Sequence, residues 1–275
     1  MLAKITTLHK RAKRATTKKY AEETVLAEHR FEFIRAELHS KGRILAGDLA
    51  AQFSVSQDTA RRDLRELAKA GDCRRVYGGA VAVAPSAGPL RVRNQLSHDE
   101  KARLASRAVK LIRSGQSLFI DSGSTNIAIA KAIPNSVELT VATNSLGVAA
   151  ALAEHSLVKL IMLGGTFDRD LGTCVGQETL RAISQLHAEL LFLGSCGVDA
   201  AHGATAFDSA EADVKRAMAR NSSAIIVVAT ADKLSTAAPF RVASPDAIRH
   251  LVVDGKVKTS TLAQFKKHGT EVHRA

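Results

Sequence analysis

From residue 98 onward, short apolar runs alternate with segments of helical periodicity. The runs are five to seven residues long and cover 117–121, 137–142, 157–163, 190–194, 224–230 and 249–253. Residues 98–113 carry an amphipathic helical pattern before the first run. Strands that are separated by helices form largely parallel sheets with helices on both faces. We therefore expect an α/β domain with a largely parallel sheet over residues 98–258, followed by a C-terminal tail over 259–275.

Three helical patterns and a hairpin precede this domain. Apolar residues recur at helical spacing within 26–38, 45–53 and 56–68. Ser56 is a good N-cap for the third helix, and Gly71 is a natural stop signal after it. Two strand patterns surround Gly78 and Gly79, at 73–77 and 80–83. Helices followed by such a hairpin predict an N-terminal winged helix-turn-helix over residues 25–83, joined by a linker over 84–97.

The basic charge of the chain is concentrated in its N-terminal part. The formal net charge is +12, and residues 1–80 contain 17 Lys and Arg against 10 Asp and Glu. The remaining residues contain 22 against 17. A strongly basic surface favours polyanionic partners, because neutralised phosphates release their counterions. Residues 1–24 are rich in Lys and Arg with little apolar periodicity, so we expect a flexible basic arm there.

The composition also argues against several classes of protein. No stretch approaches the roughly 20 apolar residues that a membrane helix needs. The N-terminus lacks the apolar core and cleavage site of a secretory signal. The three cysteines, Cys73, Cys174 and Cys196, are scattered, which fits a reducing compartment. Because the histidines take no zinc-site spacing, we expect a cytoplasmic protein without disulfides, metal site or cofactor.

The third helical pattern of the N-terminal part is polar at its start. A recognition helix is arranged in this way, because its first turns reach base edges while its apolar side packs on the other helices. Arginine suits such a surface, since it bonds guanine with two hydrogen bonds and also pairs with phosphate. A solvated basic face without a partner is the alternative reading. The candidate DNA contacts are Ser56, Gln57, Thr59, Arg61 and Arg62, with Arg74 and Arg75 at the base of the hairpin.

The stretch from residue 56 to residue 83, SQDTARRDLRELAKAGDCRRVYGGAVAV, resembles the DeoR family of transcriptional regulators. The family pattern has a Ser/Thr-rich helix start, T-x-R-R-D-L, L-x-x-x-G, and a basic residue before H-G-G-A. This chain has Tyr77 where family members usually have histidine. Both side chains can contact sugar or phosphate, so Tyr77 joins the candidate DNA contacts. The resemblance implies double-stranded operator DNA as a partner.

Small polar loops follow three of the apolar runs in the second domain. Backbone N–H groups and hydroxyls of small residues at the start of a helix bind anions. Ligands of open α/β sheets bind beyond the carboxyl ends of the strands. We therefore expect the three loops to line one crevice that binds a phosphate. The loop candidates are Asp121, Ser122, Gly123, Ser124 and Thr125 after the first run, Thr143 and Asn144 after the second, and Gly165 after the third.

Four charged residues further along the chain are further candidates for this crevice. Lysines pair with phosphate, and carboxylates accept hydrogen bonds from sugar hydroxyls. Glu211 and Lys215 are one helical turn apart, so an ordinary surface ion pair is the alternative reading for them. The four candidates are Asp199, Glu211, Lys215 and Lys233.

The second domain also resembles the DeoR sensor domain. Matching motifs include the D-x-G-S-T loop that begins at Asp121 and the F-L-G-x-x-G-x-D run from Phe192 to Asp199. The sequence A-T-A-D-K-L around Lys233 departs from the D-x-S-K pattern of many members. The resemblance covers roughly residues 25–255 and implies a phosphorylated sugar as effector, with its phosphate held by the small-residue loops.

These features together predict a repressor of a carbohydrate-metabolism operon that a phosphorylated sugar releases from its operator. We expect a homo-oligomer, a dimer or a tetramer, without enzymatic activity. One alternative is a sugar-phosphate isomerase or deaminase, since the resemblance implies enzymes among the fold relatives. Its proton carrier would be Asp121, Asp199, Asp208 or Glu211. Another alternative is a regulator whose sensor domain binds no ligand and mainly assembles oligomers. Fold kinship alone confers no activity, and the attached DNA-binding domain favours sensing.

Overall fold

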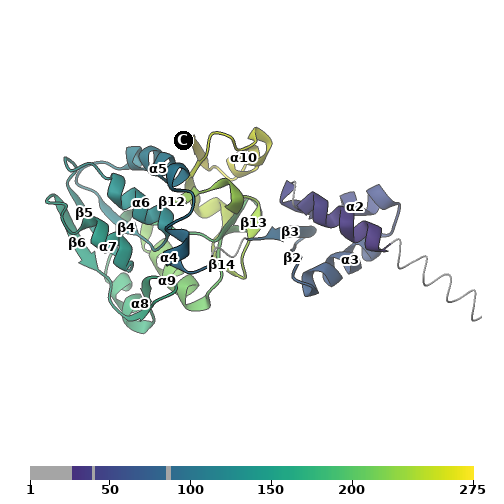
Figure 1. Ribbon diagram of the computed structural model, residues 1–275, viewed down its shortest axis with the longest axis horizontal. Helices are drawn as coiled ribbons and strands as arrows, with labels where there is room; N and C mark the ends of the chain where they lie inside the picture. Colours follow the sequence, from purple (N-terminus) through teal and green to yellow (C-terminus); the bar gives the residue numbers. More distant parts are fainter. Residues whose placement is uncertain (1–26, 39–40, 85–87) are drawn as a thin grey trace, which may run out of the picture. The chain divides into compact units, whose positions relative to one another are not determined.

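The computed structural model describes residues 27–38, 41–84 and 88–275. The chain divides into two compact units, Met1–Ala82 and Val83–Ala275, and many of their elements are labelled in Figure 1. The expected basic arm, residues 1–24, lies outside the described residues. Within the described ranges, no helix combines the length and the apolar character that crossing a bilayer requires.

The N-terminal unit combines short helices with a small antiparallel sheet. Residues 27–38 are helical. They are followed by β1 (Arg43–Leu45), α2 (Ala46–Phe53), α3 (Gln57–Lys69), β2 (Cys73–Val76) and β3 (Gly79–Val83). Strand β3 pairs antiparallel with both β1 and β2. The three helices bury Ile34, Leu49 and Leu64 in one core. This arrangement confirms the winged helix-turn-helix that the sequence predicts.

Both glycines of the hairpin have a steric role. Gly78 has a φ of 83°, a left-handed conformation that residues with a side chain rarely adopt. A Cβ atom on Gly79 would lie 2.0 Å from the carbonyl oxygen of Ile44. Strand β3 can therefore approach β1 only because Gly79 has no side chain. The Gly-Gly pair in the sequence is thus a packing requirement of the hairpin.

A buried ion pair joins the helical residues 27–38 to α3. Arg30 donates from Nε and Nη2 to the two carboxylate oxygens of Asp63, at 2.6 and 3.0 Å. Both side chains are largely buried, next to the core residues Leu64 and Leu67 of α3. A two-bond arginine–carboxylate pair fixes direction as well as distance. Asp63 therefore orients α3 on its supporting helix.

The C-terminal unit is an α/β domain on a seven-stranded sheet. The strand order is β16-β15-β12-β9-β4-β5-β6, and its neighbouring strands pair in parallel. The strands are β4 (Ser117–Ile120), β5 (Leu139–Thr143), β6 (Val158–Met162), β9 (Ala188–Leu193), β12 (Ser222–Ala229), β15 (Ile248–Val253) and β16 (Glu271–Arg274). The largely parallel sheet that the sequence predicts is confirmed.

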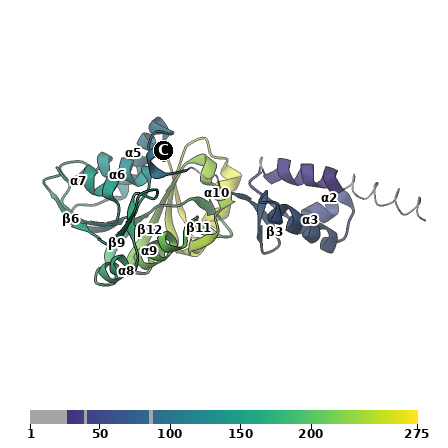
Figure 2. The ribbon, with the colours of Figure 1, turned by 60° about the horizontal axis from the view of Figure 1, so that its bottom comes forward.

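Helices cover both faces of this sheet, as Figure 2 shows. One face carries α5 (His98–Ala108), α6 (Ser124–Ala132) and α7 (Leu146–Leu152). The other carries α8 (Gln177–Ser184), α9 (Ser209–Arg220) and α10 (Thr259–Lys266). Successive side chains of a strand point to opposite faces, so the neighbours Phe119 and Ile120 enter different cores. The sheet thus separates two hydrophobic cores.

Smaller elements surround the sheet. A short helix, α4 (Leu90–Arg93), precedes α5, and 3₁₀ turns occupy Val109–Leu111, Ala231–Lys233 and Pro245–Ala247. Strands β7 (Thr166–Asp168) and β8 (Thr173–Val175) form a hairpin. A separate antiparallel sheet contains β10 (Gly197–Asp199), β11 (Gly203–Ala206) and β14 (Phe240–Ala243), and β13 (Thr236–Ala237) precedes β14.

The C-terminal residues 259–275, expected to be a tail, belong to the domain. They contain α10 and β16, and β16 pairs in parallel with β15. Helix α10 buries Leu262 and Phe265 in one of the two cores. Strand β16 is only four residues long and lies at the sheet edge, so it has no apolar run that would reveal it in the sequence.

Replacing Asp63 with alanine should destabilise the N-terminal unit by about 2–4 kcal/mol, because Arg30 would stay buried without its partner. Hydrogen exchange of the α3 amides over a urea series measures this loss. The control is Asp58→Ala, which removes an exposed carboxylate from the first turn of the same helix. That variant should lose less than about 1 kcal/mol. Equal losses in the two variants would contradict the orienting role of Asp63.

Candidate functional site

The start of α3 presents polar side chains to solvent. Ser56 caps the helix, since its Oγ accepts a hydrogen bond from the Thr59 backbone N–H at 3.1 Å. Arg61 and Arg62 are exposed, and Arg61 donates to the side chain of Gln57 at 3.2 Å. The opposite side of α3 buries its apolar residues in the core. The first turns of α3 are therefore free to approach a partner.

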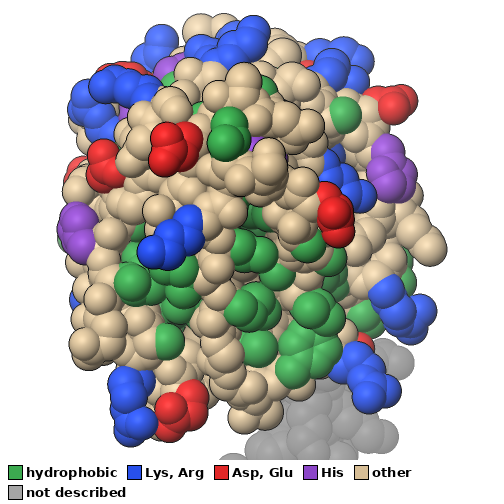
Figure 3. Space-filling model, turned by 90° about the vertical axis from the view of Figure 1, so that its left-hand side faces the viewer, with side chains coloured by type: hydrophobic (Ala, Val, Ile, Leu, Met, Phe, Trp, Pro, Cys, Tyr) green, Lys and Arg blue, Asp and Glu red, His purple; other side chains and the backbone are tan. Residues whose placement is uncertain are grey.

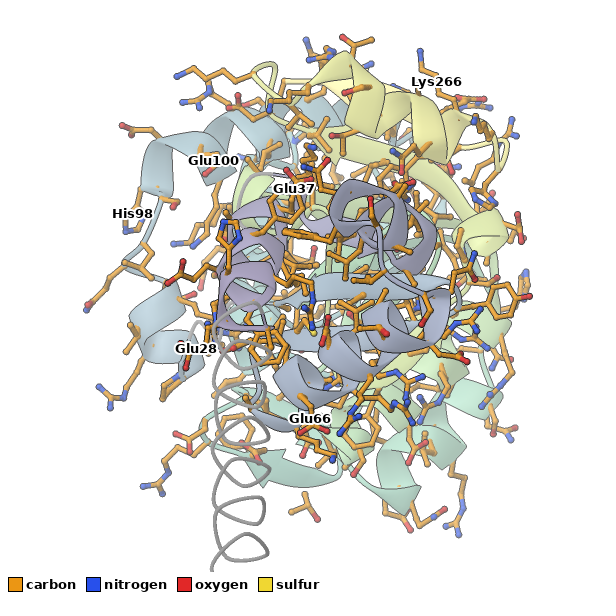
Figure 4. All side chains as sticks on the ribbon, turned by 90° about the vertical axis from the view of Figure 1, so that its right-hand side faces the viewer. Glu28, Glu37, Glu66, His98, Glu100 and Lys266 are labelled. Carbon is orange, nitrogen blue, oxygen red and sulfur yellow. The ribbon has the colours of Figure 1, made fainter. Side chains whose placement is uncertain are left out.

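The hairpin adds a second polar surface to the same unit. Tyr77 is fully exposed in the turn between β2 and β3, and Arg75 is exposed on β2. Arg74 is half-buried, and its Nε has no hydrogen-bond partner among the described residues. Two acidic residues of this unit, Glu28 and Glu66, are labelled in Figure 4. Neither belongs to the first turn of α3, where the polar candidates lie. The eight sequence candidates thus fall on α3 and its hairpin, and they remain predicted DNA contacts.

In the C-terminal unit, one lysine binds two carboxylates at the carboxyl edge of the sheet. Lys215, on α9, donates from Nζ to Oδ2 of Asp121, which directly follows β4. Its Nζ also lies 3.2 Å from Oε1 of Glu211, one helical turn earlier. All three side chains are buried. The pair of Glu211 and Lys215 is therefore part of a buried cluster rather than an ordinary surface ion pair.

Backbone groups at the end of β9 complete this cluster. Gly194 donates its N–H to Asp121 Oδ2 at 3.0 Å, and its carbonyl accepts a bond from Lys215 Nζ at 3.1 Å. A Cβ atom on Gly194 would lie 2.2 Å from the carbonyl oxygen of Ser122. The glycine of the F-L-G motif is thus required for the close approach of β4 and β9. Burial alone would lower the pKa of Lys215, but the two carboxylates outweigh burial and raise that pKa.

A pocket lies beside the cluster and is partly lined by cations. Its cationic side chains include Arg93 from α4 and Lys233 from the turn after β12. Lys233 Nζ donates to the carbonyl of Ser195 at 3.0 Å, whereas Arg93 Nε is buried and has no partner among the described residues. Burial lowers the pKa of Lys233, and the positive charge of Arg93 lowers it further. Neither Arg93 nor Lys233 forms a salt bridge among the described residues, although the negative charge of Asp232 raises the pKa of Lys233 and so offsets part of this positive charge.

The start of α6 forms another wall of this pocket. Gly123 is the N-cap, with a φ of 135°, and it has no side chain that could cap the helix. The first N–H groups of a helix have no acceptor inside the helix. The lining also includes Ser124, Thr125 and Asn126 from this first turn. Because helix N-termini attract anions, the cations and this turn favour the same kind of ligand.

The structure brings together most, but not all, of the predicted effector residues. Those that line the pocket are Ser122, Gly123, Ser124, Thr125, Glu211, Lys215 and Lys233. Asp121 contacts Lys215 just behind the lining. The lining leaves out Thr143, Asn144, Gly165 and Asp199.

The four candidates outside the lining have other contacts. Asn144 donates from Nδ2 to the carbonyl of Cys174, and Thr143 Oγ1 accepts a bond from the Ser145 N–H. Gly165 has a φ of 144° in the loop after β6. Asp199 accepts bonds from the N–H groups that follow it in its own turn. One crevice lined by all three loops therefore stays a prediction.

The predicted effector residues did not include Arg93 or the segment from Gly194 to Cys196, which also line the pocket. Arg93 falls in the stretch that the sequence indicates to be a linker, and its role depends on where α4 packs. The F-L-G-x-x-G-x-D motif that contains Gly194 was the available signal for the second segment. Burial raises the pKa of the Cys196 thiol, which keeps it protonated.

Three potential metal ligands meet on β15 and β16. Ligand atoms of His250, Glu271 and His273 lie within 4.8 Å of one another. Their neighbours are cationic: Arg107 Nη2 lies 2.9 Å from His273 Nδ1, and Arg249 pairs with Glu271 at 2.8 Å. A metal-bound histidine normally donates from its second ring nitrogen to an acceptor, whereas Arg107 offers a donor. The cluster fits the attachment of β16 to β15 better than it fits a metal site.

Replacing Lys215 with methionine should destabilise the C-terminal unit by about 3–5 kcal/mol at neutral pH, because two buried carboxylates lose their counter-charge. The loss should shrink as the pH falls. Burial and the charge of Glu211 both raise the pKa of Asp121, and without Lys215 little opposes them. A carboxyl group with a raised pKa takes up its proton more readily in the folded state, so acid favours folding.

Urea unfolding of the variant and the wild type at about pH 5 and about pH 7.5 measures this difference. The control is Lys110→Met, which removes an exposed lysine and should change the free energy of unfolding by less than about 0.5 kcal/mol. A loss of the same size at both pH values would contradict the buried charge cluster.

Known proteins resemble this chain over most of its length. The family described as DeoR C terminal sensor domain matches residues 96–255, and the DeoR-like helix-turn-helix domain matches residues 30–86. The Putative aga operon transcriptional repressor of Escherichia coli O157:H7 is 31% identical, covering 90% of this chain and 94% of its own length. The Glycerol-3-phosphate regulon repressor of Escherichia coli K12 is 32% identical, covering 83% and 91%. The repressor GlcR of Bacillus subtilis is 27% identical, covering 89% and 95%.

Solved structures resemble the chain more weakly. Ribose 5-phosphate isomerase A of Methanocaldococcus jannaschii has a TM-score of 0.38 at 15% identity, covering 50% of this chain and 54% of its own. The translation initiation factor eIF-2B of Pyrococcus horikoshii has a TM-score of 0.39 at 13% identity, covering 83% and 88%. Neither similarity supports an inference about function. The family matches and the full-length relatives do: this chain belongs to the DeoR family of transcriptional regulators.

Proposed function

We propose that this chain represses a carbohydrate-metabolism operon and leaves its operator when a phosphorylated sugar binds the pocket of the C-terminal unit. The observation that carries the effector class is the positive charge of Arg93 and Lys233 around that pocket. Burial lowers the pKa of Lys233, so its charged form is costly at this site. A bound anion removes this cost, because an opposite charge favours the ammonium form.

The rest of the lining suits a sugar that carries the phosphate. The first turn of α6 and the cations would hold the phosphate oxygens. Ser122 and Glu211 already share a hydrogen bond of 3.4 Å, and both can exchange it for bonds to sugar hydroxyls. Phosphate and hydroxyl sites next to each other favour a phosphorylated sugar over an inorganic anion. The names of the relatives, among them an aga operon and a glycerol-3-phosphate regulon repressor, agree with this class of regulator.

The enzyme alternative needs a carboxylate that is free to carry a proton. Asp121 is bound by Lys215 and Gly194, and Glu211 by Lys215 and Ser122. The other two candidates are also engaged: Asp208 caps α9, and Asp199 accepts bonds from its own turn. These contacts favour sensing over catalysis. Measurable turnover of ribose 5-phosphate or glucosamine 6-phosphate by the purified chain would reverse this choice.

Operator binding is the proposed role of α3 and its hairpin. A homo-oligomer would place two such units on repeated or palindromic half-sites. Effector binding would favour another relative placement of the two DNA-binding units and so weaken operator binding. By thermodynamic linkage, operator DNA must then weaken effector binding by the same factor. A saturating effector that left operator affinity unchanged would contradict this coupling.

Arg62→Ala should weaken operator binding by about 1–3 kcal/mol, because the exposed guanidinium can contact a base or a phosphate. Fluorescence anisotropy with DNA from upstream of the chain's own gene and its neighbours measures the affinity. The control is Arg220→Ala, which removes the same charge from the last turn of α9 in the other unit. Equal weakening by both changes would mean that overall charge, and not α3, determines binding.

Arg93→Met should weaken effector binding at least about tenfold, because a half-buried cation is lost from the pocket. Calorimetric titration with glycerol 3-phosphate, ribose 5-phosphate and glucosamine 6-phosphate, and with inorganic phosphate, measures the affinity. The matched control is Arg91→Met, an exposed arginine on the same short helix. Wild-type binding to none of these ligands would favour the ligand-free, oligomerising sensor domain.

A further inference from the structure

Strand β6 ends the seven-stranded sheet of the C-terminal unit on one side, as the strand order and Figure 1 show. Its neighbour in the sheet is β5, which it pairs in parallel. The carbonyl of Leu157 accepts a bond from Leu139, and the N–H of Leu163 donates to Thr143. The odd-numbered residues of β6 therefore direct their backbone N–H and C=O groups towards β5. Leu160 and Met162 direct theirs away from the sheet, because these directions alternate along a strand. The N–H of Val158 donates to the carbonyl of His155 at 3.1 Å.

Apolar side chains surround this edge. Leu146 is 56% exposed, Met162 is 42% exposed and Phe167 is 45% exposed, and they lie on α7, β6 and β7 respectively. Leu157, just before β6, is exposed as well. Figure 3 shows hydrophobic side chains gathered on this face of the molecule. An apolar edge strand of this kind invites pairing with another strand unless something protects it.

The opposite edge of the same sheet is protected. Strand β16 carries Glu271 and Arg274, and Glu271 pairs with Arg249 of β15 at 2.8 Å. Arg274 donates to the backbone carbonyls of Gly255 and Val257. Charged side chains and short length are the usual means by which an edge strand avoids pairing. Strand β6 has one charged residue, Lys159. Strand β16 thus carries more charge than β6, although both strands are short.

We propose that β6 is a dimer interface, at which β6 of a second copy of this chain pairs antiparallel with it around a twofold axis at Leu160. This register places Leu160 opposite Leu160 of the second copy and Val158 opposite Met162. The N–H and C=O groups of the two Leu160 residues then bond each other. The N–H of Met162 can reach the carbonyl of Val158 in the other copy, whose own N–H stays bonded to His155. Lys159 falls opposite Ile161, so the two lysines of the dimer do not face each other, and like charges directly opposite are avoided.

The pairing is self-complementary, which a twofold contact requires. It would continue the sheet of one protomer into that of the other and cover Met162 and Leu146 on the α7 side. The inference rests on the proposed function in one respect, the purpose of the dimer: a twofold axis supplies the two DNA-binding units that repeated or palindromic half-sites need. The interface itself depends on neither the effector nor the operator.

Met162→Lys should weaken self-association at least about tenfold, because it places a charge in the apolar interface. Sedimentation velocity of the full chain over a concentration series measures the assembly, whose mass should fall by half. Phe240→Lys is the matched control, since Phe240 is 37% exposed on β14, which lies in a different sheet. Circular dichroism confirms folding of both variants. A wild-type monomer, or equal effects of the two changes, would overturn the proposal.

Cysteine cross-linking tests the register of the paired strands, because it measures the formation of a covalent dimer and not a loss of association. Leu160→Cys should form a disulfide-linked dimer with copper phenanthroline, because the twofold axis brings position 160 within about 5.5 Å of itself. Met162→Cys should not, because its two copies lie roughly 13 Å apart along paired strands. The unchanged chain, with its own three cysteines, is the background. Equal cross-linking of both variants would overturn this register. Operator binding by a chain that stays monomeric would overturn the interface and leave the proposed function intact.

Discussion

The ammonium group of Lys215 joins three parts of the C-terminal unit that are far apart in the sequence. It bonds Asp121 after β4, the carbonyl of Gly194 after β9, and Glu211 on α9. Burying one charge alone would be costly, so lysine and carboxylates depend on one another. The same cluster determines the charge of the pocket beside it. Because Lys215 pairs with both carboxylates, Arg93 and Lys233 line the pocket as cations that neither carboxylate pairs with.

The position of the pocket follows from the strand order. The chain builds β4, β5 and β6 outwards in one direction and then returns to place β9 on the other side of β4. Ligands of open α/β sheets bind where the strand order reverses in this way. The loops after β4 and β9 line the pocket, whereas Thr143 and Gly165 follow strands on one side of the reversal. The sequence shows that small polar loops follow strands, but it does not show which strands are neighbours.

Local patterns therefore predicted the elements well, and long-range packing determined the remainder. Ser56 as N-cap and the apolar runs of the sheet are local signals, and the structure contains the helix and the strands that they predict. Arg93 joins the pocket through the packing of α4, a four-residue helix that carries no periodicity of its own. Strand β16 depends on pairing with β15 and on contacts such as that between Arg107 and His273. Neither could be predicted without the sheet in place.

The two units carry cationic surfaces of different physical kinds. The arginines of α3 are exposed, so dissolved salt screens them strongly. Their predicted contacts with phosphates would release counterions from the DNA. Arg93 and Lys233 are partly buried, where screening is weaker and burial shifts the pKa of Lys233. In the proposed function, an effector would therefore still bind its pocket at salt concentrations that already weaken operator binding. In the proposed function, this difference in burial would let one chain respond to a small anion while it binds a very large one.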